Sequence, residues 1–214
     1  MYKMVIFDLD GTLLNTLQDL ADAGNYSLSV FGFPVHDVEK YRYFVGNGIP
    51  KLIERIIPEM CDEHTKNKVY DEFCSYYKKH MNDNTIPYKG VIEMLSAFRK
   101  AGIISVVVTN KSAEFAEGIV NRYFGDLIDA TYGSVEGLPK KPDPYWVNKA
   151  ISDFGIDKSQ ILYVGDSGVD METAENAGLA SCGVTWGFRD KEELILHRAR
   201  MICSDCSEIV EAVL

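Results

Sequence analysis

Apolar runs of strand length alternate along the chain with longer stretches in which apolar residues recur at helical spacing. Runs such as Ser105 to Thr109 (SVVVT) and Ile161 to Gly165 (ILYVG) are almost continuous and rich in β-branched or aromatic residues. This composition is typical of strands that are buried on both faces of a parallel sheet. We expect strands at Met4 to Asp8, Ile103 to Thr109, Ala130 to Tyr132, Ile161 to Gly165 and Ala180 to Val184, with a weaker edge strand at Arg200 to Cys203.

Two of the intervening helices have clear boundaries. The first, Val91 to Ala101, ends at Gly102, and the second, Pro144 to Phe154, begins after Asp143 and ends at Gly155. Strands that alternate with helices predict the α/β fold class, here a Rossmann-like parallel sheet core with helices on both faces.

One long stretch, from Thr16 to Asn82, shows only a helical pattern. Its segments 17–33, 36–45, 48–57 and 66–81 predict about four helices. The chain then returns through residues 84–88, an extended segment that begins with turn residues. We therefore expect a small helical cap domain, residues 16–85, inserted into a core made of residues 1–15 and 86–214.

The charge of the chain limits the classes of ligand. Its 214 residues are 46% hydrophobic and 25% charged, which is ordinary for a globular protein, and the net charge is -10. Such a chain lacks the basic surface that neutralises a nucleic acid backbone, so we expect no nucleic acid partner. An anionic substrate must instead be met locally, by a metal ion or by a few placed cations.

The sequence indicates no membrane partner. No apolar stretch approaches the roughly 20 residues of a membrane span, and the apolar run near the N-terminus is too short for a signal-peptide core. We expect a cytoplasmic protein with reduced cysteines, and we interpret Cys203 and Cys206 as residues buried at a strand end. The histidines show no ligand spacing and are expected in the cap or far from the site, in surface or packing roles: His36, His64, His80 and His197.

Polar residues follow the predicted strands where each strand ends. They are Asp8 and Asp10 after the first strand, Thr109 and Asn110 after the second, Lys141 in the loop after the third, and Asp166 and Asp170 after the fourth. Ligands of open parallel sheets bind at this edge. Each residue alone has an ordinary alternative, such as a turn or a helix cap. Together, four converging carboxylates would repel one another unless a cation or a shared proton offset them, and Mg²⁺ is the simplest candidate.

The motifs resemble those of the haloacid dehalogenase superfamily, and most closely its phosphoglycolate phosphatase-like group. The similar segments are Phe7 to Leu13 (FDLDGTL), Val108 to Lys111 (VTNK), Lys141 to Pro144 (KPDP) and Val164 to Asp170 (VGDSGVD). The similarity continues through residues 174–178 and 183–187, so it covers nearly the whole core. The cap is similar only in its position and in Gly46-Asn47-Gly48.

The resemblance implies a reaction in two steps. Asp8 would attack the phosphorus and form an aspartyl phosphate. Asp10 would first protonate the leaving oxygen and then activate the water. This role needs a carboxyl group that is partly protonated near neutral pH, and we expect neighbouring carboxylates to raise the pKa of Asp10 accordingly.

The same resemblance implies how phosphate and metal are held. Thr109 and the amide of Asn110 would bind phosphoryl oxygens, while Lys141 would offset the phosphoryl charge and orient Asp8. Four residues would hold Mg²⁺: Asp8, Asp10 through its backbone carbonyl, Asp166, and Asp170 as a further ligand or as support behind the ligands.

These roles predict a magnesium-dependent phosphomonoester hydrolase that acts on a small phosphorylated metabolite. The alternatives are a phosphosugar mutase, a pyrophosphatase and a non-catalytic metabolite sensor. The phosphatase-like form of Thr109-Asn110-Lys111 disfavours the mutase, and the intact motifs disfavour the sensor. Hydrolytic dehalogenation is disfavoured because dehalogenases of the superfamily lack the second aspartate, which is Asp10 here.

The cap is expected to choose the substrate, for which we predict a small ester such as 2-phosphoglycolate. Backbone donors of Gly46-Asn47-Gly48 can approach a ligand closely, and Lys51 lies one helical turn further on. We therefore predict Asn47 and Lys51 as substrate-binding residues. The alternative is that this segment only joins two helices. The assembly is expected to be a monomer or a small homo-oligomer.

Overall fold

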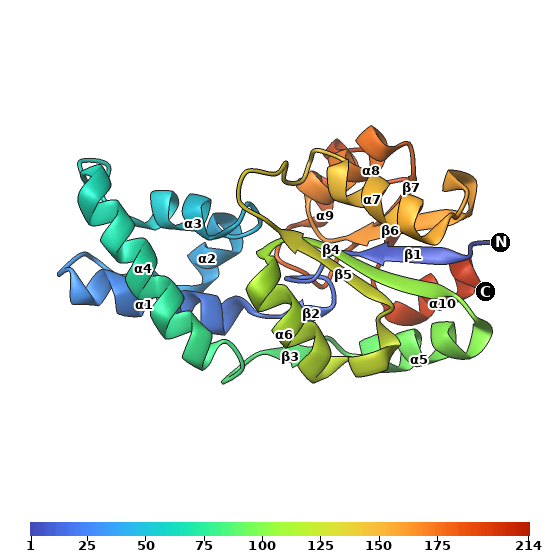
Figure 1. Cartoon of the computed structure of the whole chain (residues 1–214), viewed down its shortest axis with the longest axis horizontal. Helices are drawn as coiled ribbons and strands as arrows, with labels where there is room; N and C mark the ends of the chain where they lie inside the picture. The colour runs from blue at the N-terminus through green and yellow to red at the C-terminus, as the bar shows by residue number, and fades with distance from the viewer. The chain divides into compact units, whose positions relative to one another are not determined.

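The computed structural model describes all 214 residues and divides them into two compact units (Figure 1). The first unit comprises Met1–Leu14 and Pro87–Leu214, and the second is the inserted segment Asn15–Ile86. The sequence predicted this insertion at residues 16–85. None of the helices combines the length and the apolar character needed to span a membrane.

The first unit is built on a sheet of six strands in the order β5-β4-β1-β6-β7-β8, all parallel to their neighbours. Phe7 at the end of β1 lies opposite Val107 of β4 and Val164 of β6, so these strands end at the same edge of the sheet. The strands are β1 (Met4–Phe7), β4 (Ile104–Ser112), β5 (Ala130–Ser134), β6 (Ile161–Gly165), β7 (Ala180–Val184) and β8 (Met201–Cys203).

Helices cover both faces of this sheet through two separate hydrophobic layers. Successive residues of β1 alternate between the layers, with Val5 and Phe7 in one and Met4 and Ile6 in the other. The first layer includes α5 (Val91–Ala101), α6 (Ala113–Tyr123) and α10 (Cys206–Val213), and the second includes α7 (Tyr145–Phe154) and α8 (Gly168–Ala177). The remaining elements are α9 (Lys191–Leu196), η1 (Gly125–Leu127) and η2 (Lys158–Gln160). The predicted fold class is confirmed.

Several element boundaries differ from the prediction by a few residues, and two of the differences have a visible cause or partner. Strand β4 continues past Thr109 to Ser112, where it pairs again with Ser134 of β5 after a shift in register. Helix α7 begins at Tyr145 and not at Pro144, because the Asp143 carboxylate accepts a hydrogen bond from the Tyr145 N–H at 2.9 Å and ends the preceding turn there.

The inserted unit contains four helices, the number predicted: α1 (Leu17–Val30), α2 (Val38–Phe44), α3 (Ile49–Ile56) and α4 (Glu63–His80). Tyr41, Phe73 and Tyr77 are fully buried in its core. Tyr41 packs against Gly24 of α1, where a Cβ would overlap its ring. This close approach explains a glycine inside a helix, a position that otherwise costs about 1 kcal/mol relative to alanine.

The two connections to the inserted unit pair with each other, which the sequence did not predict. Residues Leu14–Asn15 (β2) and Ile86–Pro87 (β3) form a two-stranded sheet. The buried carboxylate of Asp19 accepts hydrogen bonds at 2.7–3.0 Å from the backbone N–H and side chain of both Asn84 and Thr85. The returning connection is therefore fastened to the first helix of the insertion.

All five cysteines are reduced. Cys203 and Cys206 are 1% and 3% exposed, so their predicted burial is confirmed. The Sγ of Cys203 lies 3.4 Å from that of Cys182 on the neighbouring strand, whereas the thiol of Cys206 donates to the carbonyl of Lys89 at 3.4 Å. The CxxC spacing therefore does not define a pair.

Candidate active site

The loop after β1 carries the first two candidate aspartates. Asp8 extends the strand, since its N–H donates to the carbonyl of Val164 at 2.9 Å. The chain then turns at Gly11, which has a φ of 90°. A Cβ at Gly11 would overlap the carboxylate of Asp166, so only glycine lets the first motif approach the fourth this closely.

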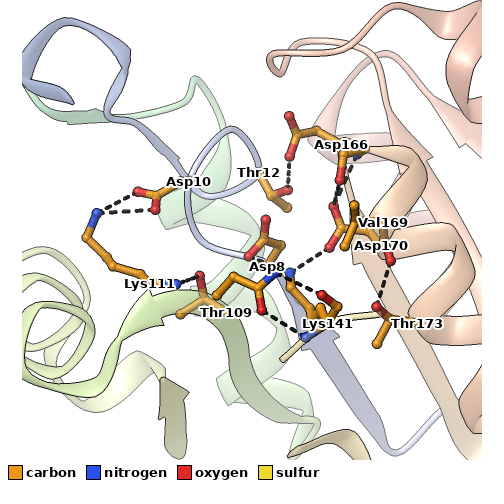
Figure 2. Close-up of polar contacts among 12 residues, drawn as sticks. Asp8, Asp10, Thr12, Thr109, Lys111, Lys141, Asp166, Val169, Asp170 and Thr173 are labelled. Atoms are coloured by element: carbon orange, nitrogen blue, oxygen red, sulfur yellow. Dashed lines mark hydrogen bonds and ion pairs between the residues drawn. The ribbon is translucent and has the colours of Figure 1, made fainter. Parts of the chain in front are cut away.

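Lys141 joins two of the buried carboxylates. Its Nζ lies 2.8 Å from Asp8 Oδ1 and 2.7 Å from Asp170 Oδ1 (Figure 2). The Asn110 side chain holds the Lys141 backbone in place, accepting from its N–H at 2.8 Å and donating to its carbonyl at 3.1 Å. The second motif therefore positions the third.

Asp170 is surrounded by hydrogen-bond donors. Besides Lys141, its Oδ1 accepts from the Tyr163 hydroxyl at 3.2 Å, and its Oδ2 accepts from the N–H and hydroxyl of Ser167 at 3.1 and 2.6 Å. The side chain is completely buried. These donors compete with a metal ion for the Asp170 carboxylate. The geometry therefore favours a role for Asp170 in holding the groups that bind the metal over direct ligation by Asp170 itself.

Asp166 is held from two sides. Its Oδ1 accepts from the Thr12 hydroxyl at 3.0 Å, and its Oδ2 accepts from the N–H of Phe188 at 2.7 Å. Both contacts come from segments far away in the sequence, and they fix the direction in which the carboxylate faces.

Asp10 forms an ion pair that the sequence did not predict. Its carboxylate oxygens are 3.0 and 3.2 Å from Nζ of Lys111, a residue of the second motif that is buried (Figure 2). An ammonium group thus lies beside this carboxylate. Charges of neighbouring carboxylates contribute to the raised pKa values of Asp8 and Asp166, and Asp10 is one of those neighbours for Asp8.

Burial raises the pKa of both crowded carboxyl groups. It raises the pKa of Asp8 to about 7 although Lys141 acts against it, and it raises the pKa of Asp166 to about 8, with the charges of Asp170 and Asp8 adding to the effect. Burial also disfavours the charge of Lys141, but Asp170 and Asp8 raise the pKa of that ammonium group well above its ordinary value. The cluster therefore holds more buried negative charge than Lys141 offsets.

The donor set fits a small divalent cation. One carboxylate oxygen each from Asp8, Asp166 and Asp170 lie within 4.8 Å of one another, and all three residues are buried. Few carboxylates together with hard oxygen donors are what Mg²⁺ requires. The side chain of Asp10 is outside this group, which leaves its backbone carbonyl as the predicted ligand.

Residues 5–184 match the family described as haloacid dehalogenase-like hydrolase. The chain belongs to this family. It is 31% identical to the phosphoglycolate phosphatase of Vibrio parahaemolyticus, over 99% of this chain and 96% of that protein. It is 32% identical to the N-acetylmuramic acid 6-phosphate phosphatase of Pseudomonas aeruginosa, over 91% and 87%. A crystal structure from Lactobacillus delbrueckii subsp. bulgaricus, provisionally named a phosphoglycolate phosphatase, superposes with a TM-score of 0.94 at 30% identity, covering 100% of this chain and 98% of that one.

Membership in the haloacid dehalogenase-like family confirms the resemblance read from the motifs and the predicted enzyme class, a phosphatase. Thr109 is buried near the end of β4, and its hydroxyl accepts a hydrogen bond from the Lys111 N–H at 3.2 Å. Thr109 thus shares the edge of the sheet with Asn110 and with the aspartate cluster.

The cap residues predicted from the sequence have local partners within the inserted unit. Asn47 accepts a hydrogen bond from Arg55 at 2.8 Å, and the same guanidinium donates to the carbonyl of Phe44 at 2.7 Å. Lys51 is exposed and pairs with Glu54 at 2.7 Å. Arg55, which the sequence reasoning did not single out, therefore orders the Gly46-Asn47-Gly48 segment.

Several side chains at the site escaped the sequence reasoning. Lys111 was named only as part of a motif, although a lysine directly after a buried strand end was a usable signal. Tyr163 and Phe188 offered no such signal in the sequence. Tyr163 belongs to an apolar run, and Phe188 acts through its backbone N–H. His197 was expected far from the motifs, which is wrong: it packs on Gly168, where a Cβ would overlap its ring, and lies 3.0 Å from Glu172.

Proposed function

We propose that this phosphatase is a magnesium-dependent phosphomonoester hydrolase that forms an aspartyl phosphate on Asp8. The observation that carries the proposal is the buried cluster of Asp8, Asp166 and Asp170 around a single lysine, Lys141. Such a cluster is stable and useful when a cation and an anionic phosphoryl group share it.

Mg²⁺ would be held by Asp8, Asp166 and the backbone carbonyl of Asp10, with Asp170 behind them or joined through water. When bound, the ion would offset the charge of the carboxylates and of the phosphoryl oxygens. Asp8 would then be present as the carboxylate that attacks.

The attack transfers the phosphoryl group from the substrate oxygen to a carboxylate oxygen of Asp8. Lys141, 2.8 Å from Asp8, orients that carboxylate and offsets the charge that develops on the phosphoryl oxygens. Thr109 and the backbone N–H of Asn110 would bind those oxygens, because the side chain of Asn110 is engaged with Lys141.

Asp10 would serve both steps. It donates a proton to the leaving alkoxide and then takes one from the water that attacks the aspartyl phosphate, returning Asp8 to its free form and releasing phosphate. The ion pair with Lys111 fixes the position of the Asp10 carboxyl group for these transfers.

The substrate is proposed to be a small phosphate ester that also carries a carboxylate, with 2-phosphoglycolate as the first candidate. Two relatives of nearly equal identity are named for phosphoglycolate and for N-acetylmuramic acid 6-phosphate, and both compounds combine a phosphate with a carboxylic acid. We propose that Asn47 and Lys51 meet the carboxylate. The local partners of these residues, Arg55 and Glu54, would have to share them with the substrate.

A single screen tests the proposal. Purified protein with Mg²⁺ is incubated with a panel of phosphorylated metabolites, and free phosphate is measured. We expect phosphate release, fastest with a carboxylate-bearing ester. Transfer to a sugar without phosphate release would identify a mutase, hydrolysis of pyrophosphate above all esters a pyrophosphatase, and binding without turnover a sensor.

A further inference from the structure

The segment after β7 touches the candidate site but has no role in the mechanism above. The similarity to the family reaches Gly187, but the resemblance implies no role for this segment. In the structure the Trp186 indole N–H donates to the carbonyl of Thr12 at 3.0 Å, and the Phe188 N–H donates to Asp166 Oδ2 at 2.7 Å. One short segment therefore contacts both Asp166 and the residue that holds its other oxygen.

Gly187 lets this segment lie directly on Asp166. A Cβ there would overlap the Asp166 side chain and the Gly11 carbonyl. The segment is thus packed so closely that a displacement of it would move Asp166 as well.

Glu193 of α9 fixes this segment to the start of α8. Its Oε1 accepts the N–H of Gly168, two residues after Asp166, at 2.8 Å. Its Oε2 lies 3.4 Å from Nε of Arg189, the neighbour of Phe188. One carboxylate thereby ties together the two chain segments whose relative position sets the hydrogen bond from Phe188 to Asp166.

We propose that Glu193 is a positioning residue for Asp166 as a metal ligand. The proposal rests on the proposed function, in which Asp166 binds Mg²⁺. Without Glu193 the Phe188 N–H and the Asp166 carboxylate are no longer held in register, so the oxygen that faces the metal loses its fixed direction. Residues that orient metal ligands from behind typically change metal affinity by about 10- to 100-fold when removed.

The test compares Mg²⁺ affinity, measured by isothermal titration calorimetry, in full-length variants. Glu193→Ala should raise the Mg²⁺ Kd about tenfold. Glu193→Gln keeps an oxygen that accepts the Gly168 N–H and should stay within about threefold of wild type, because only the ion pair with Arg189 is lost. Glu192→Ala, an exposed neighbour on the same helix, is the matched control and should bind Mg²⁺ like wild type.

Thermal unfolding without Mg²⁺ separates metal affinity from general stability. If Glu193→Ala does not fold, Glu193→Met replaces it, since methionine keeps the length of the side chain and removes both acceptor oxygens. An unchanged Kd in the folded variant would overturn the proposal, and so would a loss in Glu193→Gln as large as in Glu193→Ala. If wild type itself binds no Mg²⁺ and releases no phosphate, the proposed function fails. If wild type does both and the variants bind Mg²⁺ equally well, only the role of Glu193 fails.

Discussion

The sheet edge of the core and the inserted helical unit hold their candidate residues in different ways. At the sheet edge, contacts join residues far apart in the sequence, as Lys141 does with Asp8 and Asp170. In the inserted unit, Asn47 and Lys51 bond to residues eight and three positions away. The first arrangement depends on the register of the sheet, whereas the second can change without disturbing it. Under the proposed function, the chemistry is thereby separable from the choice of substrate.

The largest effect should come from the core. Asp8→Asn removes the attacking oxyanion but keeps the shape of the side chain, so we expect a loss of at least about a thousandfold in kcat on every substrate. Steady-state assays on 2-phosphoglycolate and p-nitrophenyl phosphate, with circular dichroism as a control for folding, measure this. A folded variant that keeps a few per cent of wild-type activity would remove Asp8 from the mechanism.

Metal removal should affect the same region and cause a similar loss of activity. Exhaustive chelation is expected to abolish turnover of both substrates, Mg²⁺ should restore it, and Ca²⁺ should restore it poorly because it prefers more ligands and a looser geometry. Full activity of the chelated protein would show that the buried carboxylates serve another chemistry.

A smaller and selective effect is expected from the inserted unit. Asn47→Ala and Lys51→Ala should each lower kcat/KM for 2-phosphoglycolate by about tenfold, which corresponds to about 1.4 kcal/mol of transition-state binding. Neither should change the rate with p-nitrophenyl phosphate, which has no carboxylate. Glu59→Ala, on an exposed residue of the same unit, is a suitable control. Equal losses on both substrates would mean that the segment only supports the fold.

The remaining effect concerns stability rather than rate, and it arises in the core alone. In the folded protein the pKa of Asp8 is raised to about 7 and that of Asp166 to about 8, from an ordinary 3.8. Between the ordinary and the raised pKa values, the folded protein therefore binds more protons than the unfolded one. The free energy of unfolding of the metal-free protein should therefore fall as pH rises from about 5 to about 8. The raised pKa of Lys141 adds no slope there, because that group stays charged throughout.

Thermal unfolding in chelator across this pH range measures the slope. Asp166→Asn should reduce the slope and leave the part due to Asp8, and Mg²⁺ should stabilise the wild type more at pH 8 than at pH 5 because metal binding needs the deprotonated groups. An equal slope in Asp166→Asn would assign the effect to the overall negative charge of the chain.

The sequence predicted the core well because its signals are local and repeated. Buried runs such as Ile161–Gly165 define strands by themselves, and parallel strands bring their carboxyl ends together. The convergence of Asp8, Lys141 and Asp170 could therefore be predicted.

What the sequence could not give were contacts that depend on exact register or on backbone groups. The pairing of Lys111 with Asp10 needs a strand that continues to Ser112. The hydrogen bond from Phe188 to Asp166 uses a main-chain N–H, which every residue except proline possesses. In the inserted unit, helices were predictable from periodicity. The partner of Asn47, Arg55, was not, because it depends on how α2 and α3 are joined.

The central claim is that Asp8 carries the phosphoryl group, and chemical trapping tests it most directly. Asp10→Asn slows hydrolysis of the intermediate, by about a hundredfold or more, so the aspartyl phosphate should accumulate with a substrate whose leaving group needs no proton, such as p-nitrophenyl phosphate. Borohydride reduces an acyl phosphate to an alcohol, which converts the modified aspartate to homoserine. Peptide mass spectrometry should find homoserine at position 8, only with substrate and Mg²⁺. Unmodified Asp8 during turnover, or modification of another residue, would contradict the account.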